Sequence, residues 1–244
     1  MIPDGVFNPI LDVDLGSGKV SNYAISQEDR LNFLGGKILG ARLLWDLLEP
    51  GTDPLTPDNP LIFTVGFFNG HNLPSSSRFN CTTRNVLTGG VASSNCGGDF
   101  GIWLRKAGYD GLILRGRADK PTTIRITEDG VTLEDATELW GKKTEEVQAT
   151  LTKPQRELVI GPAGENLVRY ACIMSGDRAL GRCGVGAVMG SKNVKLITAE
   201  GKAKLGVSDR DTLKKVIKGW VKILKDHSIT GGQLTDYGTA GMVN

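Results

Sequence analysis

Glycine is concentrated in a few short segments of this chain, and this clustering limits the fold more than any other feature. The sequence has 33 glycines in 244 residues, about twice the roughly 7% share that is average for proteins. The richest segment is residues 178–195 (RALGRCGVGAVMGSKNVK), with four glycines and four basic residues, and no carboxylate occurs from Arg178 to Ala199. Glycine is favoured where the backbone needs positive φ or must approach a ligand closely. The segment therefore predicts tight turns around a bound group, and its charge favours an anion.

The overall charge excludes several classes of partner. The net charge of +2 comes from 29 basic and 27 acidic residues, so no global field draws the protein to nucleic acid or to an acidic membrane. No stretch of eighteen apolar residues occurs, and the N-terminal MIPDGVFNPI lacks the features of a signal peptide. We therefore expect a cytoplasmic protein with neither a nucleic-acid nor a membrane partner.

The cysteines do not predict a metal site. Their spacing matches no zinc or iron-sulfur ligand pattern, and the chain has only two histidines to add as ligands. The four residues are Cys81, Cys96, Cys172 and Cys183. In a cytosolic compartment such thiols stay reduced, so we expect them to be packing or loop residues.

Hydrophobic periodicity predicts a β-rich body with short helices, an α+β fold. Strands are expected at 10–15, 19–25, 61–66, 78–86, 111–117, 122–127, 131–136, 157–161, 167–174 and 195–201. Helices are expected from the Ser26 and Asp29 capping box to Gly35, at 38–49, from Asp99 or Gly101, and at 144–151.

The pattern changes near residue 206. Residues 207–228 place apolar side chains at helical spacing, with lysines on the other faces and a capping box at Ser208 and Asp211. Without interleaved aromatic residues, the lysines indicate a solvated helix face rather than a nucleic-acid site. Residues 230–244 complete no element. We expect a domain at 1–205, followed at 206–244 by the first part of a truncated helical domain.

Known phosphate-binding motifs do not fit the glycine-rich segment. A P-loop is excluded because the glycine spacing is wrong and Ser191 precedes Lys192. Gly184, Gly186 and Gly190 form GxGxxxG, which is close to a dinucleotide fingerprint. That fingerprint opens a crossover connection of a dozen or more residues, and only about half that length separates Gly186 from the next expected strand. A Rossmann unit is therefore disfavoured.

What remains is an anion site made of guanidinium groups and backbone amides. Arg178 and Arg182 lie one helical turn apart, so on a turn or short helix both would face one side and could bind phosphate bidentately. The alternative is that these arginines pair with carboxylates elsewhere in the fold. A second loop favours the anion site, because Arg78 follows a turn of serines and Asn95 begins an NCGG sequence just before an expected helix. Asn95 could instead be an ordinary turn residue.

The order of motifs along the chain resembles one known family. The matching segments are GTDPLTPDN, SSSR, the NxGG loop, KAGYDG, LWGK, IGPAGENLVRYACIM and GVGAVMGSKNVK. Together they resemble the N-terminal domain of the tungsten-containing aldehyde:ferredoxin oxidoreductases. The resemblance implies a base of two mostly antiparallel β-sheets. On this base would lie a bis-pterin cofactor that holds tungsten or molybdenum through its own sulfurs.

The resemblance also assigns residues. It places Arg78 between the pterin and a 4Fe-4S cluster, and it assigns the backbone carbonyls of Asn95 and Ala179 to a magnesium ion that bridges the pterin phosphates. The other implied cofactor contacts are Gly97, Gly101, Arg178, Gly181 and Arg182. Magnesium suits such a place because it prefers oxygen ligands and phosphates.

Several positions depart from the family pattern. The chain has Asp177 where histidine is usual, Leu180 where a small residue is usual, and Cys183 where glycine is usual. Cys96 replaces serine, Asp99 replaces an aromatic residue, and GFFNG replaces GPLTG. We expect the added carboxylates to weaken phosphate binding unless magnesium or an arginine offsets them.

The implied reaction is the oxidation of an aldehyde to a carboxylic acid, with ferredoxin as the electron acceptor. The family's cluster ligands and catalytic residues match nothing in these 244 residues. We therefore expect the chain to be inactive without further C-terminal domains or a partner subunit. The sequence leaves open whether the chain forms homo-oligomers. Two other functions remain as alternatives: a nucleotide-binding domain, and a non-catalytic scaffold that has lost the cofactor.

Overall fold

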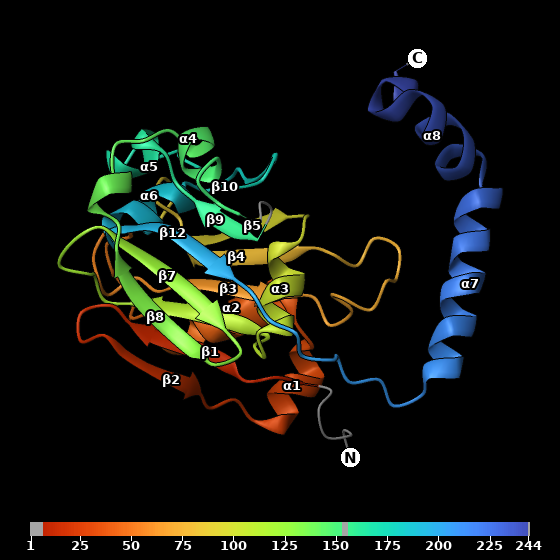
Figure 1. The fold of residues 1–244 in the computed structure, drawn as a ribbon, viewed down its shortest axis with the longest axis horizontal. Coiled ribbons are helices and arrows are strands. Elements are labelled where there is room, and N and C mark those ends of the chain that lie inside the picture. Colours follow the sequence, from red (N-terminus) through yellow and green to blue (C-terminus); the bar gives the residue numbers. More distant parts are fainter. Residues whose placement is uncertain (1–6, 153–155, 244) are drawn as a thin grey trace.

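Two six-stranded sheets form the body of the protein (Figure 1), in a computed structural model that describes residues 7–152 and 156–243. The first sheet has the order β2-β1-β6-β3-β4-β5 and the second has the order β11-β10-β9-β12-β7-β8. Among the described strands, the β1–β6 and β7–β12 pairs are parallel and the other pairs are antiparallel. This confirms the α+β fold with two mostly antiparallel sheets.

The strand bounds follow the predicted pattern closely in most places. In the first sheet they are β1 Ile10–Asp14, β2 Lys19–Tyr23, β3 Leu61–Val65, β4 Phe79–Arg84, β5 Val91–Cys96 and β6 Gly111–Arg115. In the second they are β7 Thr122–Thr127, β8 Gly130–Asp135, β9 Glu157–Val159, β10 Ile173–Ser175, β11 Arg178–Leu180 and β12 Val194–Ala199. The helices are α1 Gln27–Phe33, α2 Gly36–Leu47, α3 Phe100–Lys106, α4 Thr144–Gln148, α5 Pro162–Glu165, α6 Val185–Ser191, α7 Arg210–Asp226 and α8 Leu234–Tyr237.

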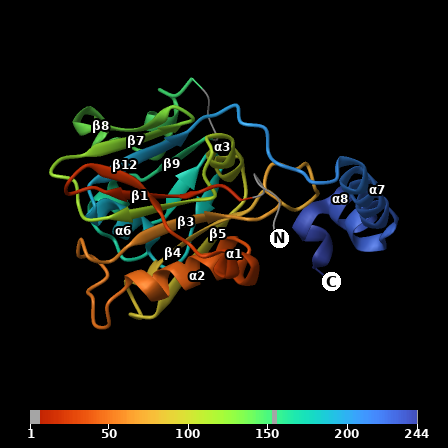
Figure 2. The same cartoon turned by 90° about the horizontal axis from the view of Figure 1, so that it is seen from below.

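The main hydrophobic core lies between the two sheets. Alternate residues of β3 show how it is built, because Leu61 and Phe63 join this core whereas Ile62 joins a second cluster beneath α2. Successive side chains of a strand point to opposite faces, so a fully apolar strand can feed two layers. A third cluster under α4 includes Val147 and Leu196 and covers the outer face of the second sheet. Figure 2 shows α1 and α2 along the outer face of the first sheet.

Several short segments differ from the prediction, among them the helices α5 and α6, which were not expected. Residues 167–174 were expected as one strand, but Leu167 has positive φ and only Ile173–Ser175 forms β10. The strands β5 and β11 were not expected. Both end a sheet, where pairing with one neighbour is enough to define a strand of mixed polarity.

The C-terminal residues form an arm, here residues 207–243, that projects from the body (Figures 1 and 2). Its helix α7 was predicted, but the N-cap is Asp209 and not Ser208, since the Asp209 carboxylate accepts from the backbone N–H groups of Asp211 and Thr212. Residues 228–242, expected to be irregular, form further helical turns.

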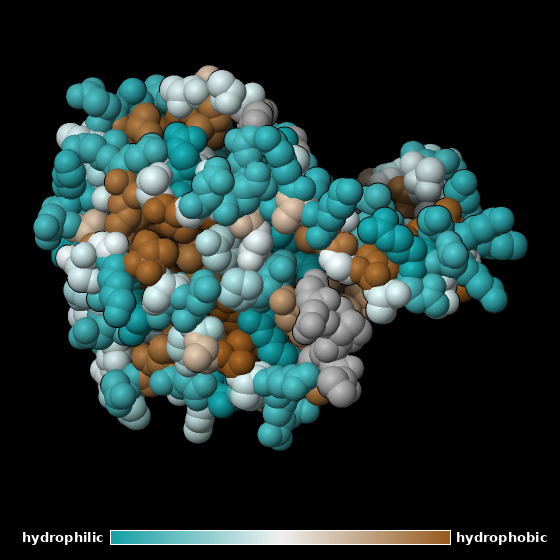
Figure 3. All heavy atoms as spheres, turned by 60° about the horizontal axis from the view of Figure 1, so that its bottom comes forward, coloured by the Kyte–Doolittle hydropathy of each residue, from teal (hydrophilic) through white to brown (hydrophobic). Residues whose placement is uncertain are grey.

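No residue of α7 is buried, and the apolar residues Leu213, Ile217, Val221 and Leu224 of its stripe are only half-buried. The surface view shows hydrophobic and hydrophilic residues side by side on the arm (Figure 3). Within the described ranges, none of the helices has the length and apolar character needed to cross a membrane.

Candidate functional site

The predicted site residues gather where the edges of the two sheets meet. Strand β5 ends the first sheet and β11 ends the second, and the two strands contact one another. The backbone N–H of Arg182, just after β11, donates to Ser94 Oγ in β5 at 3.2 Å. An edge strand keeps alternate backbone N–H and C=O groups free of ladder bonds. The meeting point therefore offers backbone donors and acceptors from both sheets.

Arg178 joins the two glycine-rich loops. A Cβ atom placed on Gly97 would lie 3.4 Å from Arg178 Nη1, and one placed on Gly98 would lie 3.2 Å from Arg178 Cδ. The arginine side chain therefore lies across the bare backbone of these two glycines. Gly98 also has φ of +110°, a conformation that other residues adopt only with strain. The structure thus brings residues 95–98 and 177–182 together; with Arg78 they are called the two-loop site.

Arg78 reaches the same place from the start of β4. Its Nη1 donates to Asn95 Oδ1 at 2.9 Å. Burial raises the pKa of the Cys96 thiol, and the guanidinium groups of Arg178 and Arg78 both act to lower that pKa. The thiol is therefore close to both cations, one from each sheet. Asn95 lies in β5 and its side chain orients an arginine, so it is more than an ordinary turn residue.

The three arginines of the two-loop site have no acidic partners among the residues that the structure describes. Within residues 7–152 and 156–243, none of the salt bridges includes Arg78, Arg178 or Arg182. All three are exposed. The alternative that these arginines neutralise carboxylates elsewhere in the fold is therefore wrong for the part of the chain described. The guanidinium groups of Arg78 and Arg178, which both act on Cys96, remain able to bind an anion together.

A hollow of about 310 Å³ opens beside Arg178, lined by Gly98, Ser175, Asp177 and Arg178. Ser175 is 3% exposed, and its Oγ has no hydrogen-bond partner among the described residues. A buried hydroxyl without a partner costs free energy unless a ligand or water satisfies it. Bare glycine backbone, free guanidinium groups and this hydroxyl together suit a phosphate-bearing ligand. The Asp177 carboxylate at the rim suits an accompanying cation.

Two predicted contacts have different surroundings. Gly101 is buried in α3, where an added Cβ would lie 2.6 Å from Asn69 Nδ2 and 3.1 Å from Phe79 Cβ, so this glycine allows the helix to pack closely. Gly181 is exposed just after β11, and Ala179 is half-buried within it.

Arg178 lies in a strand and Arg182 in the following turn, so the two do not share a helical turn as predicted.

The glycines of the GVGAVMG sequence serve packing rather than ligand binding. A Cβ on Gly184, Gly186 or Gly190 would overlap backbone atoms of residues 164–172. These glycines let α6 lie directly against α5 and the loop that follows it. The preceding strand β11 and the following strand β12 are not neighbours, and β12 runs parallel to β7. The segment is therefore not a Rossmann βαβ unit. This removes the alternative that the glycine-rich segment binds a dinucleotide as a Rossmann fingerprint does.

The structure also shows neighbours of the site that sequence reasoning did not single out. Ser175 lines the hollow, and Glu157 and Gln148 contact the turn at Gly176. The sequence signal that could have identified Glu157 is its charge, which is unusual within the apolar stretch ELVIG. All four cysteines are free thiols, and Cys81 and Cys96 are buried.

Comparison with known proteins agrees with this arrangement. Residues 10–201 match the family model described as aldehyde ferredoxin oxidoreductase, N-terminal domain. The chain is 39% identical, over 98% of its length, to the tungsten-containing aldehyde ferredoxin oxidoreductase of Pyrococcus furiosus, and it spans 41% of that protein. It is 34% identical, over 88% of its length, to the WOR-like subunit of an aliphatic sulfonate oxidoreductase of the same organism, and it spans 38% of that protein.

A solved structure shows the same fold. The BamBC active-site complex of benzoyl-coenzyme A reductase with 1,5-dienoyl-CoA contains a chain that superposes with a TM-score of 0.84 at 32% identity, covering 90% of this chain and 35% of that one. The matched family region includes both loops of the site and both sheets. The chain therefore belongs to the aldehyde ferredoxin oxidoreductase family.

Proposed function

We propose that this chain is the cofactor-base domain of a bis-pterin oxidoreductase that uses tungsten or molybdenum. The observation that carries the proposal is the convergence of Arg78, Arg178 and the backbone of Arg182 where the edges of the two sheets meet, with none of the three arginines in a salt bridge among the described residues. Pterin cofactors of this kind end in phosphates, for which guanidinium groups are well-suited donors. The name of the Pyrococcus furiosus relative, which contains tungsten, supports the choice of metal.

Each residue of the site has a separate role in this proposal. Arg178 and Arg182 hold the phosphates, and Gly97 and Gly98 leave room for the Arg178 side chain to lie across their backbone. The carbonyls of Asn95 and Ala179, on the two edge strands, hold a magnesium ion between the phosphates. Arg78 lies toward a 4Fe-4S cluster that the rest of the enzyme would supply.

When bound, the metal–pterin group supplies the two-electron chemistry, and the protein supplies binding, orientation and electrostatics. The complete enzyme would oxidise an aldehyde to a carboxylic acid and pass the electrons to ferredoxin. Because the chain spans 41% of its relative, we assign residues 1–205 to the base and 206–244 to the start of a helical domain. The apolar stripe of α7, in which no residue is buried, would pack against the remainder of that domain.

The test is the cofactor content of the complete enzyme. Arg178→Ala and Arg182→Ala should each lower tungsten and pterin per chain by tenfold or more, since a charge-assisted hydrogen bond contributes roughly 1.5–3 kcal/mol. Arg117→Ala is the control, because Arg117 is also exposed but lies outside the two-loop site. Full tungsten occupancy in both site variants would contradict the phosphate role.

A second measurement uses the present chain alone. With half a cofactor site, it should retain no tungsten or molybdenum after purification, and stoichiometric metal would overturn this expectation. A thermal-shift screen with NADP and ATP addresses the nucleotide alternative, because a ligand that binds the folded state raises its stability. We expect no shift with either nucleotide.

A further inference from the structure

The turn between β10 and β11 is held from outside the hairpin by two side chains. Glu157 Oε1, in β9, accepts from the backbone N–H of Gly176 at 2.8 Å. Gln148 Nε2, at the end of α4, donates to the backbone O of Gly176 at 3.1 Å and to Glu157 Oε1 at 2.9 Å. Both backbone groups of Gly176 are thus bound by side chains. Gly176 and Asp177 form the two-residue turn, because Ser175 pairs with Arg178 across the hairpin.

Within its sheet the hairpin is paired through few residues, although Ile173 and Leu180 anchor it in the main core. Strand β10 pairs with β9 through one residue pair, Met174 with Val159, and β11 is a three-residue edge strand. Arg178 is the first residue of β11 and lies immediately after the turn. Its side chain lies across Gly97 and Gly98, and in this way it contacts the loop of residues 95–98. A small rotation of the hairpin would therefore move the guanidinium group away from the other loop.

Glu157 is costly as a purely structural residue. It is fully buried and is followed by Leu158 and Val159, which are also buried, and its Oε2 has no partner among the described residues. An unpaired buried carboxylate oxygen loses its hydration without replacement. An apolar residue would fill this position of β9 at lower cost. The bonds that Glu157 makes go to Gln148 and to the turn that presents Arg178.

We propose that Glu157 and Gln148 are positioning residues that fix the turn at Gly176 and thereby aim Arg178 into the two-loop site. This inference rests on the proposed function, in which Arg178 binds a cofactor phosphate. Loss of the Glu157 acceptor frees the hairpin and weakens cofactor retention without removing any group that would touch the cofactor. The side chain acts through Gly176 and Arg178 only.

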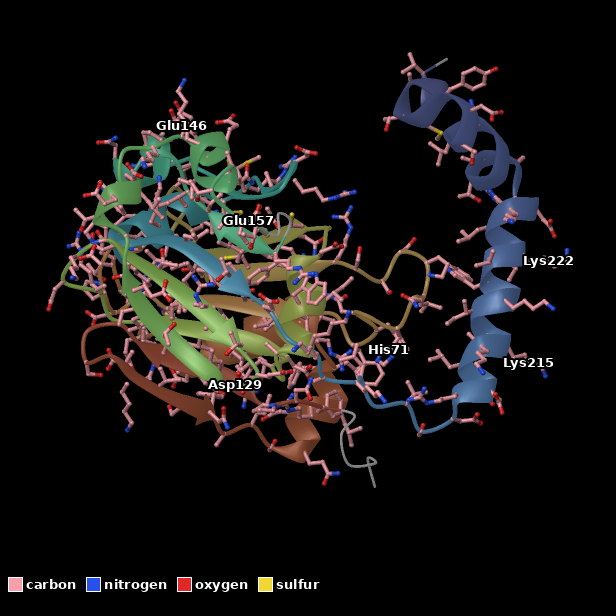
Figure 4. The ribbon with its side chains drawn as sticks, in the orientation of Figure 1. His71, Asp129, Glu146, Glu157, Lys215 and Lys222 are labelled. Atoms are coloured by element: carbon pink, nitrogen blue, oxygen red, sulfur yellow. The ribbon has the colours of Figure 1, made fainter. Side chains whose placement is uncertain are left out.

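The variants separate positioning from general support of the fold. Glu157→Leu removes the acceptor at similar size, whereas Glu157→Gln keeps a carbonyl oxygen that can accept from Gly176. Glu146→Ala is the matched control, because the Glu146 carboxylate accepts from Lys143 N at 2.6 Å and caps the same helix, α4, that carries Gln148. Figure 4 shows Glu146 on α4 and Glu157 on β9. Arg178→Ala reports the proposed function itself.

The first readout is amide hydrogen exchange of the chain. In Glu157→Leu, peptides that cover residues 173–181 should exchange at least tenfold faster, while peptides of β7 stay unchanged. Glu157→Gln and Glu146→Ala should leave the hairpin within twofold of the original chain. Equal exchange of the hairpin in Glu157→Leu and the original chain would overturn the inference.

The second readout is tungsten and pterin content of the complete enzyme. Glu157→Leu should lower it at least fivefold, with Glu157→Gln restoring it to within twofold and Glu146→Ala leaving it unchanged. If Arg178→Ala loses cofactor and Glu157→Leu does not, the inference fails and the proposed function stands. If Arg178→Ala keeps its cofactor, the proposed function fails. Should Glu157→Leu not fold, Gln148→Met carries both readouts, and an unchanged hairpin and cofactor content would overturn the inference.

Discussion

Replacing Gly98 by alanine tests whether the contact between the two loops matters. Gly98 has φ of +110°, and an added Cβ would lie 3.2 Å from Arg178 Cδ. A non-glycine residue in such a conformation costs about 1–3 kcal/mol. The contact with Arg178 adds little to this cost, because a flexible side chain can move by a few tenths of an ångström. Most of the lost stability should therefore come from the backbone.

Gly108 is the matched control for that backbone cost. It has φ of +99°, and an added Cβ would meet nothing within 4 Å. At about 2–4 °C per kcal/mol for a domain of this size, Gly98→Ala and Gly108→Ala should lower Tm by a similar amount, about 2–12 °C. Only Gly98→Ala displaces Arg178.

The decisive comparison is cofactor content in the complete enzyme. If displacement of Arg178 removes one charge-assisted hydrogen bond to the cofactor phosphate, the loss is roughly 1.5–3 kcal/mol. The affinity of the enzyme for its cofactor then falls by about tenfold to hundredfold in Gly98→Ala, and it does not fall in Gly108→Ala. Tungsten is measured by mass spectrometry, and pterin by fluorescence after oxidation. Equal cofactor content in the two variants would refute the reasoning that Arg178 must lie across Gly98. An unchanged Tm in Gly98→Ala would refute its backbone geometry.

Three further predictions concern stability. Burial lowers the pKa of Lys192 from 10.5 to about 8. Between these two pH values the folded state binds fewer protons than the unfolded state, so the free energy of unfolding rises with pH from about 8 to 10.5. Lys192→Met should flatten this rise, as measured by urea unfolding at pH 7.5, 9 and 10. Gly190→Ala should destabilise the protein by about 1–3 kcal/mol or more, because the added Cβ overlaps the backbone of α5. Gly219→Ala, in open space on α7, should instead stabilise that helix by up to about 1 kcal/mol. Equal urea-unfolding midpoints for the two variants would contradict the packing role of Gly190. Asp209→Ala should lower the helicity of α7 by circular dichroism, at a cost of about 1 kcal/mol, and Ser208→Ala should not; the reverse result would restore Ser208 as the cap.

Local patterns predicted the regular elements where one physical effect dominates. The hairpin of β1 and β2, the hairpin of β7 and β8, and the amphipathic helix α7 follow from alternation or helical spacing alone. The edge strands β5 and β11 could not be found in this way. Their sequences, VASSNC and RAL, are short or polar, and each becomes a strand because a neighbour offers an open edge.

Sequence reasoning named two loops that the structure brings together, but it did not predict how they meet. Ser94 and Arg182 are 88 positions apart and are joined by a hydrogen bond, a proximity that no spacing rule contains. The role of Gly184, Gly186 and Gly190 was misread for a related reason. Close packing of backbone and close approach of a ligand both require glycine, and only the three-dimensional neighbours distinguish them. Glu157 was missed because its contacts depend on Gln148 and Gly176 folding beside it.

An experimental structure of the complete, cofactor-bound enzyme tests the central claim most directly. Our account places phosphate oxygens within hydrogen-bonding distance of the Arg178 and Arg182 side chains, with a cation between the carbonyls of Asn95 and Ala179. A cofactor whose phosphates lie elsewhere, with these two guanidinium groups left in solvent, would contradict it.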